Sequence, residues 1–387
     1  MASVSSTKLF LPHLRHALYA SPDELQALSV ESRADLALSL LEASRFPGMA
    51  WKRFVVDQAE VAARGIQDRY LRSAISQSRC LLSRIAGDID RAALVLRNPD
   101  QDVGPNNMGA QPVDSRQYAA SGQEILQQAL NCVQVEEISA ARGLLEGWSQ
   151  LGHAPSQIEQ AVLFRRNLML GRLLRFQGAF SESLARLEEA QQAARVPNGL
   201  VFDEDLRDLA CELADTLREL DDPASAERLL REEMERRGRS GSSLPSSSPL
   251  DLCLAEALFA QSRLDEAESL CLEVQSRPDL LKFERLRLHI TLAKIRHVRS
   301  ANEEALACWG EAMKAIGKFR LTNGRTTRVI VVSICDTLSV LGHASLVSFR
   351  QVAALDELAR PGVIQHWIAG LRHWLEYLRS QDRLGSA

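Results

Sequence analysis

The sequence predicts an all-α fold, and three observations predict it. Glycine and proline are sparse, at 21 and 13 of 387 residues. Leucine, alanine, glutamate, arginine and glutamine, which favour helices, are abundant. Apolar residues recur along most of the chain at the spacing of one helix face. The run Val329–Val332 is the one cluster of β-branched residues, and because helical spacing continues on both sides we expect a buried helix there.

A helical hairpin built on one small residue recurs along the chain. Its clearest copy runs from Arg165 to Ala194, and the same small position in the second helix returns roughly every 40 residues, a period that indicates stacked repeats. A small residue lets two helices cross closely. The small position is occupied in turn by Ala92, Ala141, Ser183, Ala226, Ala267, Ala305 and Val347. A turn precedes most of the second helices, at Gly87-Asp88, Gln177-Gly178, Asp221-Asp222-Pro223, Gln261-Ser262 and Arg299-Ser300.

These repeats predict a right-handed α-solenoid of about six to seven hairpins, with capping helices at both ends. We divide the chain into a helical segment 1–60, the solenoid 61–320, and a C-terminal hairpin with its capping helix, 321–387. Within 1–60, Ser21-Pro22-Asp23-Glu24 is typical of a helix start. Loops are expected near 98–118 and 238–249, where glycine, proline and serine gather.

The end of the chain carries an apolar stripe on one helix face, formed by Ile364, Trp367, Leu371, Trp374 and Leu378. A solenoid needs its terminal apolar face covered, which favours a capping helix. The alternative is a docking face for a partner, with Trp367, Leu371 and Trp374 as its contacts.

Composition and charge exclude several classes of protein. The formal net charge of −4 is too small to indicate a nucleic-acid partner. No apolar stretch approaches the length of a membrane span or of a signal-peptide core, so we expect a cytoplasmic protein, with the nucleus as the second location. The seven cysteines form no C-x-x-C pair and are expected to be buried, reduced thiols.

Motifs for chemistry are absent from the sequence. There is no G-x-x-x-x-G-K-[ST], G-x-G-x-x-G, G-x-S-x-G or H-E-x-x-H pattern. Scattered histidines bring no third ligand for a zinc ion. We therefore expect no enzyme, no cofactor and no metal.

The clearest hairpin resembles the tetratricopeptide repeat. Its matching residues are Leu170, Gly171, Leu174, Gly178, Phe180, Leu187 and Ala190, with Ser183 in place of the small alanine. The resemblance extends over about residues 70–350, where the other copies match mainly at the second-helix alanine. A related helical-repeat class of longer period remains an alternative. The resemblance implies that the first helix of each hairpin lines a concave groove that binds a peptide or helix of another protein.

Carrying this geometry onto the chain gives candidate groove residues, which are Arg165, Arg172, Arg175, Arg287 and Lys294. Arg172 and Arg175 lie three residues apart on one helix, so they can hold a carboxylate together, and an acidic partner follows. The alternative is that these arginines pair with acids of the neighbouring hairpin, such as Asp208 or Asp215.

The sequence thus predicts a non-catalytic scaffold or adaptor that binds a protein partner in its groove. The alternative function is a structural subunit of a larger complex that assembles through its terminal helices. Arginines before Ser240 and Ser242 make these serines candidates for phosphorylation. The sequence predicts no oligomeric state.

Overall fold

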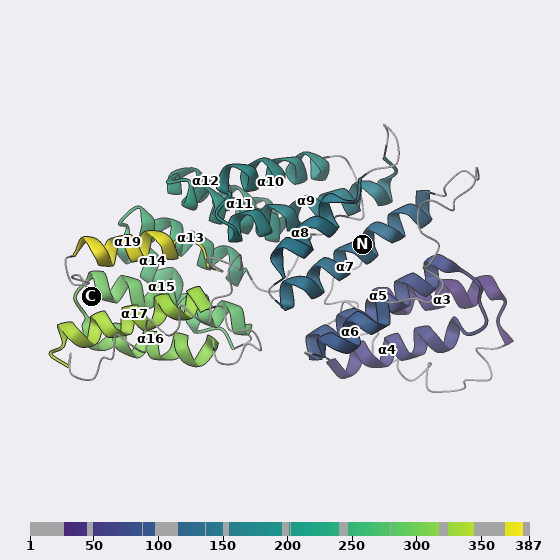
Figure 1. Cartoon of the computed structure of the whole chain (residues 1–387), viewed down its shortest axis with the longest axis horizontal. Helices are drawn as coiled ribbons and strands as arrows, with labels where there is room; N and C mark the ends of the chain where they lie inside the picture. Colours follow the sequence, from purple (N-terminus) through teal and green to yellow (C-terminus); the bar gives the residue numbers. More distant parts are fainter. Residues whose placement is uncertain are drawn as a thin grey trace. The chain divides into compact units, whose positions relative to one another are not determined.

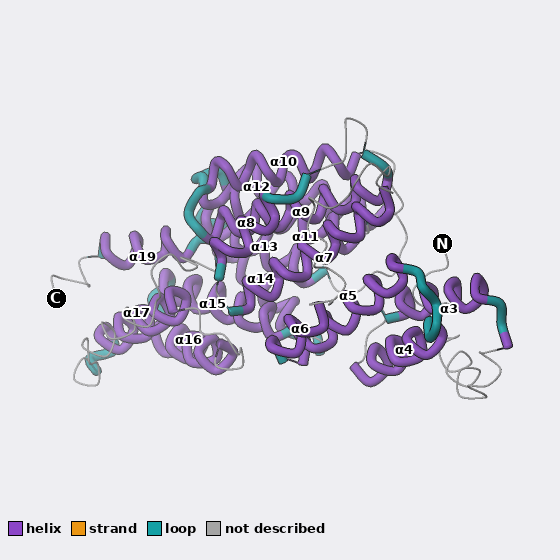
Figure 2. Tube along the Cα trace, turned by 45° about the vertical axis from the view of Figure 1, so that its right-hand side comes forward, coloured by secondary structure: helices purple, strands orange, loops and turns teal. Residues whose placement is uncertain are grey.

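The computed structural model describes residues 27–44, 49–86, 88–96, 115–135, 137–149, 155–195, 201, 203–239, 247–278, 280–316, 324–343 and 368–381. Over these ranges the chain forms helices and no strand (Figures 1 and 2). The fold class is therefore all-α, as the spacing of apolar residues predicts. The helices divide between two compact units, Met1–Leu163 and Phe164–Ala387, and each is described by itself.

The N-terminal unit is a stack of three helical hairpins. Its helices are α3 (Val30–Ala43), α4 (Met49–Ala62), α5 (Arg69–Ala86), α6 (Ile89–Leu96), α7 (Ser115–Gln134) and α8 (Ile138–Glu146). Consecutive helices pack as pairs, and α5 packs on both α3 and α7, so the first helices of the hairpins lie against one another. Ala92 and Ala141, the predicted small positions, are fully buried where their helices cross.

The C-terminal unit is also built of paired helices. The unit boundary falls within α9 (Gln157–Phe176), which pairs in sequence with α10 (Phe180–Arg195). The further helices are α11 (Asp203–Glu219), α12 (Pro223–Arg239), α13 (Ser248–Ala260), α14 (Leu264–Gln275), α15 (Lys282–Val298), α16 (Asn302–Ile316), α17 (Gly324–Val340) and α19 (Leu371–Ser380). The first helices α11, α13 and α15 pack in sequence, as expected for an α-solenoid.

The small residue of each second helix marks a close helix crossing. Ser183, Ala226, Ala267 and Ala305 are fully buried. In the clearest hairpin the opposite helix contributes Gly171, where an added Cβ would lie 2.5 Å from Leu187 Cγ. Ser183 Oγ also donates to the Gly171 carbonyl at 2.8 Å. The repeated small residue inferred from the sequence therefore lies at the contact between the two helices of a hairpin. Val347, the last predicted copy, lies outside the described residues.

The turn between the two helices is also repeated. Gly178, Asp221, Ser262, Ser300 and Gly342 all have a left-handed backbone, with φ between 61° and 81°. Each lies two residues after the last residue of a first helix. The amide of the next residue donates to a backbone carbonyl in that helix, as from Ala179 to Leu174 at 2.9 Å. This is a Schellman-type helix end. Gly342 places the same turn after α17.

The run Val329–Val332 lies within α17, and Val329 and Ile330 are buried. The predicted buried helix is confirmed. Neighbouring helices cover this segment, so its β-branched side chains pack in a core.

The expected loops are shorter than predicted where the structure describes them. Helix α12 extends to Arg239, α13 begins at Ser248, and α7 begins at Ser115. Proline at the first turn of a helix is favourable, which explains why Pro249 belongs to α13 rather than to a loop. The division at residues 60 and 320 follows the repeat pattern, whereas packing divides the chain at Leu163; the former stays a prediction. The predicted helix start at Ser21 lies outside the described residues.

All seven cysteines are free thiols, and all but Cys132 are buried. Burial raises the pKa of the Cys271 thiol. These thiols fill small apolar positions, as expected from their placement in the helices.

Candidate protein-interaction face

The first helices of the C-terminal unit are joined by ion pairs that run from one hairpin to the next. At one end, Arg165 of α9 lies 3.2 Å from Asp205 of α11. Arg172 Nε donates to Glu212 at 2.6 Å, and Arg175 donates to the other oxygen of Glu212 at 2.9 Å. The basic face of α9 is thus matched to the acidic face of α11.

The pairing continues through a buried network in the middle of the unit. Arg218 lies 2.9 Å from Asp215 and 2.6 Å from Glu256 of α13. Arg287 of α15 pairs with Asp215 and donates to Glu256 at 2.8 Å. Thr291 adds a hydrogen bond to Glu256 at 3.1 Å. Glu256 therefore pairs with two arginines, and Asp215 lies within 4 Å of three. These pairs connect the first helices of successive hairpins.

The buried arginines of this network stabilise the ionised form of its carboxyl groups. Burial raises the pKa of the Asp215 carboxyl, but Arg287, Arg218 and Arg175 outweigh it, so the pKa lies below its ordinary value. The same balance, with Arg287 and Arg218 as the cations, lowers the pKa of Glu256. Both acids are thus held as carboxylates, and removal of either would leave Arg218 and Arg287 to share a single buried carboxylate.

Lys294 lies next to this network and is 1% exposed. Its Nζ lies over the Phe259 ring, 5.0 Å from the centroid. Burial lowers the pKa of Lys294 to about 8, although the nearby carboxylate of Glu256 raises it. Lys294 is a buried part of the network and does not project into solvent.

The candidate groove arginines pair with acids of other hairpins, which is the alternative that the sequence left open. Arg165 and Arg172 keep 26% and 34% of their side-chain surface exposed. Arg175, Arg287 and Lys294 are buried. Sequence reasoning named Asp215 as a pairing acid and missed Glu212, which lies one turn before Asp215 on the same face of α11. Asp208, the other acid named, pairs with Arg207 of its own helix.

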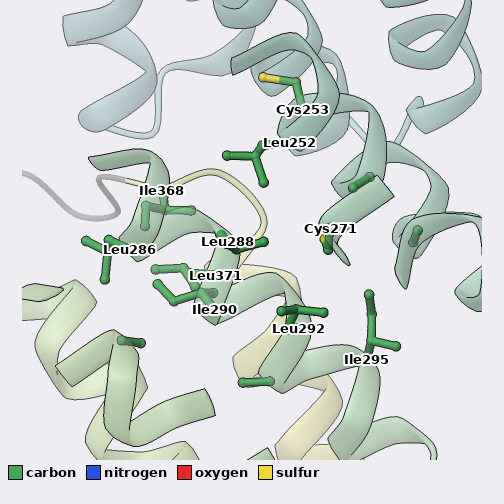
Figure 3. Close-up of a cluster of buried hydrophobic side chains, with 14 of the residues drawn as sticks. Leu252, Cys253, Cys271, Leu286, Leu288, Ile290, Leu292, Ile295, Ile368 and Leu371 are labelled. Carbon is green, nitrogen blue, oxygen red and sulfur yellow. The ribbon is translucent and has the colours of Figure 1, made fainter. Parts of the chain in front are cut away.

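Helix α19 packs on the first helices through one aromatic side chain. Trp374 is 2% exposed, and its Nε1 donates to Ser333 of α17 at 2.9 Å. Its ring meets Phe259 of α13 at 6.4 Å and His297 of α15 edge-on at 5.2 Å. Trp309 of α16 lies 6.0 Å away. Around this ring, Ile368 and Leu371 belong to the same buried cluster as Leu286 and Ile290 of α15 (Figure 3).

Polar contacts hold the N-terminal end of α19 against α11. The Gly370 amide, which caps α19, donates to Glu219 Oε1 at 2.6 Å. Arg372 donates to the Glu219 carbonyl at 3.0 Å, and His373 lies 2.8 Å from Asp221. Gly370 has φ of 77°, a conformation that favours glycine. We call the contacts of α19 on the first helices, namely Glu219, Phe259, His297 and Ser333, the first-helix face.

Two residues of the C-terminal stripe, the alternative docking face, lie against the chain's own helices. Leu371 and Trp374 are buried against the chain's own helices, where α13, α15 and α16 supply the aromatic partners of Trp374. The stripe covers apolar surface, as the capping interpretation expects. Trp367 lies outside the described residues, and so do Ser240 and Ser242.

Over the described residues, no three metal-ligating side chains gather. In the same residues, no helix has the length and apolar character needed to cross a membrane.

No family model matches this chain, and no curated protein matches it. Solved structures with a similar arrangement of helices include a tetratricopeptide repeat protein from Parabacteroides merdae, at 11% identity and a TM-score of 0.44, over 80% of this chain and 98% of that one. The C-terminal part of a TPR repeat-containing protein from Cytophaga hutchinsonii has 12% identity and a TM-score of 0.33, over 74% and 96%. The Cut9–Hcn1 hetero-tetramer of APC/C has 16% identity and a TM-score of 0.35, over 93% and 71%.

Proposed function

We propose that this protein is a non-catalytic interaction scaffold that binds a helix or peptide of a partner protein on its first-helix face. The observation that carries the proposal is the seating of α19, because a helix of this chain already packs on Phe259, His297 and Ser333. Helix-in-groove recognition uses apolar anchors at the spacing that α19 has. We place the protein in the cytoplasm, with the nucleus as the second location.

The candidate arginines then divide into two roles. Arg165 and Arg172 retain exposed surface on α9 and orient the partner. Arg175, Arg287 and Lys294 hold the first helices in register from inside. All four of these arginines pair with acids of the chain, so the expectation of an acidic partner rests on the exposed surface that Arg165 and Arg172 keep.

Quantitative affinity purification with the full chain tests the proposal. Charge reversal at Arg165→Glu and Arg172→Glu is expected to reduce recovery of the specific partner at least tenfold, with unchanged helicity by circular dichroism. Arg186→Glu and Arg231→Glu provide the matched control, since both arginines are exposed on second helices. Equal loss with both pairs, or loss with neither, would place the partner elsewhere.

The alternative function, a structural subunit that assembles through terminal helices, loses its main support because Leu371 and Trp374 are buried within the chain. Light scattering of the isolated chain distinguishes the two functions. A soluble monomer agrees with the scaffold, whereas aggregation that co-expression of a partner relieves agrees with the subunit.

A further inference from the structure

We propose that α19 is an intramolecular ligand of the first-helix face, and that the partner binds as an amphipathic helix that displaces it. The inference rests on the proposed function and adds the chemistry of the partner and its regulation. The partner helix carries an aromatic residue at the position of Trp374, apolar residues three before and four after it, and a basic residue in its first turn.

Helix α19 contacts more hairpins than a terminal cap would need to contact, and we therefore infer that it occupies the position of a ligand. In a helical-repeat stack each hairpin contacts its neighbours, so a terminal cap needs only the last hairpin. Helix α19 instead extends from α17 back to α11, where Gly370 binds Glu219 across 151 residues of sequence. Arg372 also lies over the Phe180 ring of α10, 5.7 Å from its centroid. Helix α19 therefore crosses the first helices of several hairpins, which a simple cap does not require.

The apolar seat has the pattern of a helix-binding site. Leu371, Trp374 and Leu378 are buried on one face of α19, while Glu376 and Arg379 on the other side are exposed. Such spacing belongs to any amphipathic helix and not to α19 alone. A partner with an aromatic anchor flanked by apolar residues can thus take the same place.

The polar end of the seat determines the direction and charge of the helix. Glu219 is 3% exposed, yet it meets the Gly370 amide and lies 3.6 Å from Arg372 and 3.9 Å from His373. A carboxylate at a helix N-terminus is favourable, and a basic first turn adds to it. The face therefore selects a helix that is basic in its first turn, while the exposed surface of Arg165 and Arg172 favours acidic residues elsewhere on the partner.

Occupation by α19 is expected to be reversible, because the helix is short. At ten residues it is below the length at which isolated helices are stable in water, so it folds only when docked. Because α19 belongs to the same chain, its docking is intramolecular, which favours it over a free helix of equal affinity. A free helix of equal affinity must then compete poorly with α19, and weakening α19 must expose the site.

The experiment measures binding of a synthetic fluorescein-labelled peptide with the sequence of residues 368–381 to the full chain, by fluorescence anisotropy. Arg372→Glu brings an acid to Glu219 and weakens α19 from a half-buried position. Arg379→Glu makes the same charge change on the exposed side and is the matched control. Hydrogen exchange over residues 371–380 reports whether α19 has been released.

We expect the peptide to bind the Arg372→Glu chain at least tenfold more tightly than the wild-type and Arg379→Glu chains. A Trp374→Ala peptide should not bind, and Glu219→Gln added to the Arg372→Glu chain should weaken binding of the wild-type peptide. If Arg372→Glu leaves α19 protected from exchange, a Trp374→Ala chain repeats the measurement. A helix that stays protected in both chains is a permanent cap, and the inference is then wrong.

The remaining outcomes separate the inference from the proposed function. Equal, Trp374-dependent binding to wild-type and Arg372→Glu chains would keep the face as a helix site but overturn the role of α19. No binding to a chain whose α19 is released would overturn both. A wild-type dimer that the peptide dissociates would assign the face to α19 of a second copy instead of a partner.

Discussion

Gly171 lies where the two helices of the clearest hairpin cross, and its lack of a side chain allows Leu187 to approach. The sequence identified this pair and Ser183, because a small residue opposite a large one at a fixed spacing is a local signal. The ion pairs between hairpins were harder to predict. Arg172, Asp215 and Glu256 could be placed on the first helices, but which acid meets which arginine depends on how far one hairpin is rotated on the next.

We expect Gly171→Ala to lower the free energy of unfolding by about 1–3 kcal/mol, because its methyl group would displace Leu187 from a tightly packed site. Gly310→Ala in α16 is the control, since an added Cβ meets nothing within 4 Å there. This second change should stabilise the protein by about 0.5–1 kcal/mol. Urea unfolding measures both, and destabilisation by the two changes alike would contradict the packing argument.

Glu256→Gln should lower the free energy of unfolding by about 3–5 kcal/mol, because it removes one of the two buried carboxylates that Arg218 and Arg287 share and leaves Asp215 alone to balance both cations. Glu266→Gln removes an exposed partner of Arg263 and should leave the free energy of unfolding almost unchanged. Urea unfolding at neutral pH gives the two values. A small effect of Glu256→Gln would mean that water already compensates the network.

We expect the free energy of unfolding to depend on pH through Lys294, with a sign that follows from the lowered pKa of this lysine. Between pH of about 8 and its ordinary value of 10.5, the unfolded chain binds more protons at this lysine than the folded chain. The free energy of unfolding therefore rises with pH across this window, through this group. Lys294→Met should stabilise the protein at pH 7 and remove that rise. A wild-type profile parallel to that of Lys294→Met would show that the lysine does not titrate there.

At the scale of helices and turns, the same helix end is used in successive hairpins. Gly178, Asp221, Ser262 and Ser300 take the left-handed position, and the sequence pointed to each of these turns by its polar residues. What the turn residues could not reveal is the place of α19. Its stripe predicts that one face is covered, but a stripe looks the same whether its cover is the last hairpin, a partner, or helices 150 residues earlier.

Substitutions in these turns are expected to raise the free energy of unfolding, whereas most substitutions lower it. Ser262→Gly and Ser300→Gly should each stabilise the protein by up to about 1 kcal/mol, because glycine removes the steric cost of a positive φ. Ser269→Gly on the exposed side of α14 is the same substitution in a helix interior and should destabilise by about 0.5–1 kcal/mol. Thermal unfolding separates these outcomes, and equal losses at all three serines would contradict the turn assignment.

At the scale of the whole molecule, the chain is an array of hairpins whose contacts divide it at Leu163. The sequence predicts the array from its period, but not this division, because the repeat frame continues through α9 without a change of spacing. The α19 contacts are long-range within the C-terminal unit, so they connect repeats that would otherwise meet only their neighbours.

This division predicts how destabilisation spreads. Gly171→Ala should speed amide exchange of α11 and α13 in the C-terminal unit, because neighbouring repeats share their stability. It should leave exchange of α5, in the N-terminal unit, unchanged. Native-state hydrogen exchange followed by mass spectrometry measures both. A uniform increase over the whole chain would indicate one cooperative unit instead of two.

The hydrogen-exchange footprint of the purified partner on the full chain shows where the partner binds and whether α19 leaves its seat. We expect added protection in α11, α13, α15 and α17, around Glu219, Phe259, His297 and Ser333, together with loss of protection over residues 371–380. A footprint on the second helices α10, α12, α14 and α16, with α19 still protected, would contradict this expectation.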